Sequence, residues 1–249
     1  MKVALLINEV TSDIDGNLAS IITLVNQACD AGAKLVLLPE TALTGLVNND
    51  DPRHDLPLSQ TIPGAYTQCL GEVCIKRNIW LATGLLERDG NRLYDAAVLL
   101  DPTGAVHLKY RRIQPQWHGR LADPHVYCQG SDLPVADTPW GRTAIIICGD
   151  LFDDAVVERV NTAGVQLLIL PFARCFSDGT PNQMRWDQDE MPVYCERIAR
   201  TGSTTLMANY LALPELMGGA FGGAFVVKGD GTVITRYSLG STGMLLVDL

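Results

Sequence analysis

Thr143-Ala-Ile-Ile-Ile-Cys-Gly-Asp150 is an apolar run that ends, without a spacer, on a cysteine, a glycine and an acid. Residues 144–147 show neither a helical stripe nor polar alternation, which is typical of an interior strand in a sheet covered on both faces. In open α/β sheets, chemistry takes place just beyond the carboxyl ends of such strands. Cys148 is therefore a candidate functional residue, although an arbitrary cysteine is more often inert core packing.

The first half of the chain repeats this pattern. The matching segments are Val3-Ala-Leu-Leu-Ile-Asn8 with Thr143 to Cys148, and Ala31-Gly-Ala-Lys-Leu-Val-Leu-Leu-Pro39 with Ala163-Gly-Val-Gln-Leu-Leu-Ile-Leu-Pro171. A stretch between the two segments of each half can form a helix, so we predict two strand-helix-strand halves that share one core. Under this alignment Glu40, directly after Pro39, lies on the same rim as Cys148.

The order of the predicted elements indicates an α/β fold. Strands and helices alternate at first, and a late run of strands follows a helix near 186–200, which predicts mixed sheets covered by helices. A chain of 249 residues with 47% hydrophobic content can bury the core of one domain, and we assign 1–249 to a single domain. The stretch 111–139 shows little regular pattern, and loops of this length are usually functional.

Composition disfavours several classes of partner. The net charge is -9 and the sequence contains no block of basic residues, which disfavours nucleic acid and anionic membranes as partners.

No apolar run approaches the roughly 20 residues of a membrane span, so we expect a soluble protein. The odd number of cysteines, seven, and the lack of an export signal predict reduced thiols in the cytoplasm. The spacing of Cys69 and Cys74 and of the histidines gives no metal-site pattern.

A cysteine that attacks an amide or nitrile carbon needs two further groups. One is a base that takes the thiol proton and later activates water, and the other is a cation or hydrogen-bond donor that faces the developing oxyanion. Glu40, Lys109 and Cys148 offer this set, each at or near the end of a predicted strand. Glu40 can act as the base only if partial burial raises its pKa.

With these residues in place, the chain resembles the nitrilase superfamily of carbon-nitrogen hydrolases over nearly its whole length. The resemblance is carried by Leu37-Leu-Pro-Glu40, Lys109-Tyr-Arg111 and Ile147-Cys-Gly-Asp-Leu-Phe152. It implies a triad of Glu40 as general base, Lys109 as oxyanion stabiliser and Cys148 as nucleophile. It also implies a four-layer αββα sandwich, assembly into homodimers or larger homo-oligomers, and no metal or organic cofactor.

Three positions bear on how closely the site follows the family. The family usually has an aromatic residue directly after the cysteine, where this chain has Gly149, whose backbone N–H can still donate to an oxyanion. The loop 111–139 contains no second glutamate, and Asp123 is either its substitute or an exposed loop acid. Arg174 can hold a substrate carboxylate or pair with Asp178 or Glu190.

The sequence therefore predicts an amidase-type hydrolase. It would convert a small amide into a carboxylic acid plus ammonia or an amine, through a thioester on Cys148. An N-carbamoyl compound or a nitrile is the alternative substrate. A catalytically silent binding or scaffold protein stays open because of Gly149 and the missing glutamate. A Cys-His protease is disfavoured, because no histidine lies at a comparably marked strand end.

Overall fold

Two six-stranded sheets form the centre of the protein in the computed structural model, which describes residues 1–213, 216 and 219–249. The first sheet has the order β14 (Gly243–Asp248), β1 (Lys2–Ile7), β3 (Leu35–Leu37), β4 (Trp80–Asp89), β5 (Arg92–Leu100), β6 (Val106–Arg111). The second has the order β13 (Val233–Tyr237), β12 (Ala224–Val227), β10 (Thr204–Asn209), β9 (Leu167–Phe172), β8 (Gly141–Ile145), β7 (Val135–Thr138). A small parallel pair joins β2 (Glu9–Val10) to β11 (Leu211–Ala212).

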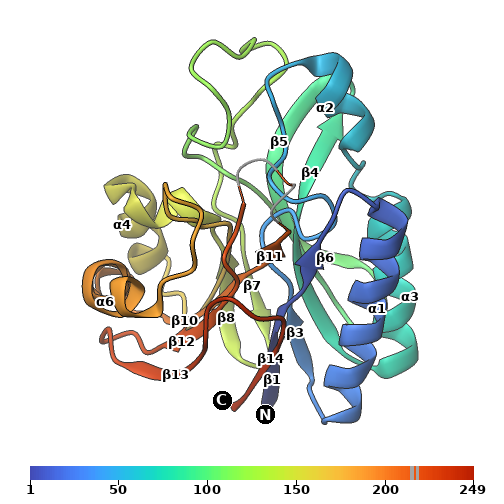
Figure 1. The fold of residues 1–249 in the computed structure, drawn as a ribbon. Coiled ribbons are helices and arrows are strands. Elements are labelled where there is room, and N and C mark those ends of the chain that lie inside the picture. Colours follow the sequence, from blue (N-terminus) through green and yellow to red (C-terminus); the bar gives the residue numbers. More distant parts are fainter. Residues whose placement is uncertain (214–215, 217–218) are drawn as a thin grey trace.

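Helices cover the outer face of each sheet, which gives the four-layer αββα sandwich (Figure 1). The first sheet is covered by α1 (Ile14–Asp30) and α3 (Ala65–Arg77), and the second by α4 (Asp154–Thr162) and α6 (Met191–Thr201). Shorter elements are α2 (Pro52–Leu58), α5 (Gln183–Arg185), a 3₁₀ turn (Cys148–Phe152) and a π-helical turn (Trp186–Glu190). Within the described ranges, no helix is long and apolar enough to cross a membrane.

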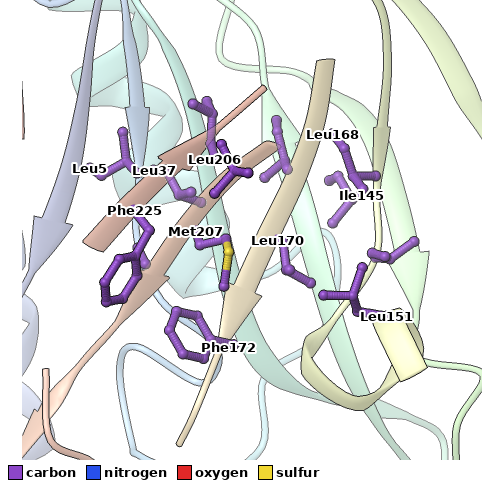
Figure 2. Packing of buried hydrophobic residues seen from close by; sticks show 14 of the residues in the cluster. Leu5, Leu37, Ile145, Leu151, Leu168, Leu170, Phe172, Leu206, Met207 and Phe225 are labelled. Atoms are coloured by element: carbon purple, nitrogen blue, oxygen red, sulfur yellow. The ribbon is translucent and has the colours of Figure 1, made fainter. Parts of the chain in front are cut away.

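The main core joins the two sheets. Figure 2 shows Leu5 and Leu37 of the first sheet in one cluster with Leu170, Leu206 and Phe225 of the second. All five side chains are almost completely buried. Burying such a side chain contributes about 1.5–3 kcal/mol, so this layer fixes the sheets against each other.

The internal repeat is confirmed by the strand registers. In the first half β1 pairs in parallel with β3 and Val3 lies opposite Leu35, whereas in the second half β8 pairs in parallel with β9 and Thr143 lies opposite Leu167. These are the residues that the sequence alignment matches. The connecting helix α1 has 17 residues and α4 has 9, which fits the shorter spacing in the second half.

Several elements differ from the sequence expectation. The helix α2 was not predicted; it begins at Pro52 after Asp51, whose side chain accepts a hydrogen bond from the Arg53 N–H. The strand β7 lies within the stretch expected to be irregular. The helix expected near 186–200 is preceded by α5 and begins with the π-helical turn before continuing as α6. Single π turns often mark functional sites, and this one carries Glu190.

Candidate active site

Glu40 lies just beyond the carboxyl end of β3 and is completely buried. The neighbouring strand β4 passes so close that a Cβ atom at Gly84 would lie 2.6 Å from the Glu40 Cα. The Gly84 N–H donates to the Pro39 carbonyl over 3.0 Å, which holds the strand end in place. The carboxyl group is therefore fixed by main-chain packing that only glycine at position 84 allows.

Cys148 lies beyond the end of β8, at the first position of the 3₁₀ turn. Its φ is 45°, a left-handed conformation that costs a residue with a side chain about 1–3 kcal/mol and tends to persist at functional sites. The thiol is partly exposed, and Sγ lies 3.7 Å from the Ala173 carbonyl oxygen at the end of β9. The strained turn thus presents the sulfur at the rim where strands of the second sheet end.

Asp150 ties this turn to the segment that follows β6. Its Oδ2 accepts hydrogen bonds from the Ile147 N–H over 3.0 Å and the Tyr110 hydroxyl over 2.7 Å. Its Oδ1 accepts from the N–H groups of Ile113 and Gln114 over 3.1 and 2.8 Å. A single buried carboxylate therefore fixes the nucleophile turn relative to the chain just after Arg111.

Arg112 is the cation of this cluster. Its side chain is 4% exposed, with Nη1 3.0 Å from Glu40 Oε1 and 3.2 Å from Asp95 Oδ2. Its Nη2 lies 3.2 Å from Gln114 Oε1, and its N–H donates to the Asp95 carbonyl. Burial would lower the pKa of Arg112, but Cys148, Glu40 and Asp95 raise it more, so the guanidinium stays charged.

Two buried carboxyl groups share this one guanidinium. The pKa of Glu40 is raised to about 8, first by burial and second by Cys148, while Arg112 acts in the opposite direction. Burial and then Glu40 raise the pKa of Asp95 well above its ordinary range. One guanidinium cannot balance two buried carboxylates, so the pair retains a proton near neutral pH. A carboxyl group poised in this range is suited to proton transfer.

Lys109 is not part of the cluster, and its predicted position is corrected. Side chains alternate along β6: Leu108 and Tyr110 point into the core, so Lys109 and Arg111 point to the other face. Lys109 Nζ lies 2.5 Å from Glu87 Oε1, at a surface pocket of about 480 Å³ that Arg111 also lines. The resemblance implied a lysine beside the nucleophile, and the structure places the guanidinium of Arg112 against Gly149, the residue that follows Cys148.

The other predicted residues have mixed outcomes. Asp123 is exposed and caps a turn, with its Oδ1 accepting from the His125 N–H over 2.9 Å. Its exposure favours the other interpretation given for Asp123, an exposed loop acid. Gly149 follows Cys148 in the 3₁₀ turn and abuts the Arg112 guanidinium.

Arg174 forms a two-pronged contact with Glu190, which is the pairing given above as the alternative. Its Nη2 lies 2.6 Å from Glu190 Oε1 and its Nε 3.2 Å from Oε2. Its main chain is held by Asn209, whose Nδ2 donates to the Arg174 carbonyl over 2.9 Å. Burial would lower the pKa of Arg174, and Glu190 and, more weakly, Cys148 raise it. Arg174 is thus close enough to interact with Cys148 but is already paired.

Sequence reasoning missed Arg112, Asp95 and Gln114, and it quoted Asp150 without a role. The alternation of Leu108 and Tyr110 was the available signal for Arg112, because a period of two continued from Tyr110 points residue 112 inward. Asp95 lies in an apolar run, and nothing in that run marks it as a partner of Glu40. Among the residues the structure describes, no group of His, Cys, Asp and Glu side chains is arranged to hold a metal ion.

A family model described as carbon-nitrogen hydrolase matches residues 2–249. The chain is 24% identical over 270 residues to an aliphatic nitrilase of Sinorhizobium fredii (strain HH103), across 96% of this chain and 83% of that protein. It is 30% identical to a formamidase of Bacillus cereus (strain Q1), across 65% and 48% of the two chains. It is 28% identical to an omega-amidase of Homo sapiens, across 69% and 63%. The match thus spans about half to two thirds of the last two proteins.

Solved structures have the same fold. A variant of the amidase from Nesterenkonia sp. AN1, described as showing Michael addition of acrylamide at its active-site cysteine, has a TM-score of 0.81 at 22% identity, across 100% of this chain and 93% of that one. A glutamine-dependent NAD⁺ synthetase from Acinetobacter baumannii has a TM-score of 0.77 at 18% identity, across 98% and 44%. At these identities the likeness shows the fold.

Proposed function

Because the chain belongs to the carbon-nitrogen hydrolase family, in the nitrilase superfamily, we propose that it hydrolyses a small amide through a thioester on Cys148. The observation that carries the proposal is the pairing of a thiol presented at a strained strand end with a buried acid of raised pKa, Glu40. Each is an ordinary residue elsewhere in a protein. Together they form a nucleophile with its own base.

The first half of the reaction forms the acyl-enzyme. Glu40 takes the proton of the Cys148 thiol, and Sγ attacks the amide carbon, so that the carbonyl electrons move onto oxygen. As this oxyanion collapses, the carbon-nitrogen bond breaks and Glu40 returns the proton to the leaving nitrogen. The products of this half are a thioester on Cys148 and ammonia or an amine. The Gly149 N–H is a candidate donor to the oxyanion.

The second half releases the acid. Glu40 takes a proton from water, and the hydroxide attacks the thioester carbon. The carbon-sulfur bond breaks, the thiolate recovers the proton from Glu40, and the carboxylic acid leaves. The base therefore begins each half-reaction in the same ionised state.

Amides are favoured over the alternative substrates because a formamidase, an omega-amidase and an amidase of known structure are all similar to this chain. A nitrilase is similar as well, so nitriles belong in any substrate panel. Arg174 is a reason to compare amides with and without a carboxylate. A substrate carboxylate would have to displace Glu190 in order to bind Arg174. Assembly into homo-oligomers and a cytoplasmic location stay predictions.

The proposal is tested with a panel of neutral amides, carboxylate-bearing ω-amides, N-carbamoyl amino acids and nitriles. We expect ammonia and the free acid from at least one amide, and a hydroxamate when hydroxylamine competes with water for the thioester. Mass spectrometry should place the acyl group on Cys148. If only nitriles or carbamoyl compounds react, the alternative substrate class is correct. If nothing reacts and haloacetamides label Cys148 no faster than Cys69, the silent interpretation is correct.

Replacing Lys109 by methionine tests the corrected site. We expect kcat/KM to stay within about threefold of the wild type, because Lys109 points to the face of β6 away from Glu40 and Cys148 and its partner Glu87 keeps its contact with Arg111. Steady-state ammonia release on the best amide measures this. A loss of a hundredfold or more, on the order of a missing oxyanion donor, would return Lys109 to the catalytic set.

A further inference from the structure

We propose that Arg112 supplies the positive charge that stabilises the oxyanion, and that Gly149 is a glycine because the guanidinium fills the space its side chain would need. The inference rests on the proposed function and assigns the group that this function requires opposite the base. The chain departs from the resembled pattern in two ways: it has no lysine beside the nucleophile, and it has a glycine directly after the nucleophile. The inference explains both departures by one structural change.

Both terminal nitrogens of the Arg112 guanidinium are hydrogen-bonded. Nη1 donates to Glu40 and Asp95, and Nη2 donates to Gln114. Asp150 in turn fixes the Gln114 main chain to the nucleophile turn. A guanidinium presents its donors in a rigid planar fork, whereas a lysine ammonium is one point on a flexible stem. The position of this charge relative to the nucleophile turn is therefore set by contacts on two sides.

Gly149 is where the fit is closest. A Cβ atom added there would lie 2.4 Å from Arg112 Nη2 and 3.1 Å from Gln114 Oε1. Contacts of the first kind do not occur in real structures, so one of the two groups must move. The end of an exposed arginine would move at little cost, but Arg112 is buried and bonded to three partners. An alanine at position 149 must therefore break the contacts that aim the guanidinium.

A lysine at position 112 would remove this conflict. It reaches Glu40 or Asp95 with a single nitrogen and has no second arm toward Gly149. The aromatic residue that the family usually carries after its cysteine is then compatible with a lysine and incompatible with Arg112. We therefore expect the effects of substitutions at positions 112 and 149 to be coupled, although the two residues follow different strands and lie far apart in sequence.

The test is a double-mutant cycle of Arg112→Lys, Gly149→Ala and the double variant, with Lys109→Met as the matched loss of a nearby cation. Amide kcat and KM are measured separately. We expect Gly149→Ala to lower kcat by about 10²-fold, the size of a lost oxyanion donor, with little change in KM. In the Arg112→Lys background the same alanine should change kcat by less than about threefold, because the clash is gone.

Additive effects, or a Gly149→Ala variant with wild-type kcat, would overturn the inference. If Gly149→Ala does not fold, as shown by loss of its cooperative thermal transition, the comparison of Arg112→Lys with the double variant still decides. Equal kcat values in these two support the coupling, and a large further loss in the double variant overturns it. If the wild type hydrolyses no amide of the panel, the proposed function fails instead. In that case the coupling of positions 112 and 149 is still measured, by comparing the folded fraction of Gly149→Ala with that of the double variant.

Discussion

Replacing Cys148 with alanine is expected to lower amide hydrolysis by at least about 10⁴-fold, because the remaining groups can bind and polarise the substrate but cannot form the thioester. The measurement is ammonia release under single-turnover and steady-state conditions. The acyl adduct that hydroxylamine traps in the wild type should be absent. The protein should remain folded, since the change removes one partly exposed sulfur atom and keeps a side chain with the same backbone preference at φ 45°.

The control is Cys69→Ala, which removes another partly buried thiol, on α3 away from the strand ends. Its activity should equal that of the wild type. A Cys148→Ala variant that still hydrolyses the confirmed substrate at a comparable rate would exclude the thioester mechanism. Retained substrate binding by Cys148→Ala, seen as protection against thermal unfolding, would separate loss of chemistry from loss of the site.

Much of the fold could be predicted because the sequence contains an internal repeat. Buried parallel strands are continuous apolar runs, and two such runs with matching ends, Val3 to Asn8 and Thr143 to Cys148, indicate equivalent positions in two halves. The registers of β1 with β3 and of β8 with β9 confirm this equivalence. Glu40 and Cys148 could be assigned to one rim from that symmetry, and Cys148 is, after burial, the next cause that raises the pKa of Glu40.

The cation could not be predicted in the same way because Lys109-Tyr-Arg-Arg112 offers several cations within four residues. Which of them faces the nucleophile depends on the phase of β6, and a shift of one residue exchanges the two faces. The partially exposed salt bridge of Lys109 with Glu87 and the buried contacts of Arg112 settle the phase. The role of Asp123 could not be predicted for a related reason, because the path of an irregular loop is not encoded in its spacing.

The contact between Arg112 and Asp95 affects the ionisation of the proposed base, Glu40. A lone buried glutamate beside a cation would be held ionised, but here a second acid competes for the same nitrogen of Arg112. Glu40 and Asp95 therefore titrate as a coupled pair, and the ionisation that controls the reaction belongs to that pair. Glu40 is the member that interacts with Cys148, so its ionised form is the one that accepts the thiol proton.

The pH dependence of the rate tests this description. With the pKa of Glu40 raised to about 8 by burial and by Cys148, kcat/KM should rise about tenfold for each pH unit on the acid side and level off above about pH 8. The sign follows from the role: an acid of raised pKa is protonated below that pH and cannot act as a base. The profile is measured with a neutral amide, so that the substrate does not titrate.

Glu40→Gln is the matched variant, because it keeps the size and one acceptor oxygen of the side chain but cannot accept the proton. We expect its kcat to fall by about 10²–10⁴-fold, the usual contribution of a general base. The acid limb near pH 8 should disappear with it, since the titrating group has been removed. A limb that persists unchanged in Glu40→Gln would assign the ionisation to another group. A wild-type limb near the ordinary glutamate range would mean that water reaches Glu40 and that burial does not set its pKa.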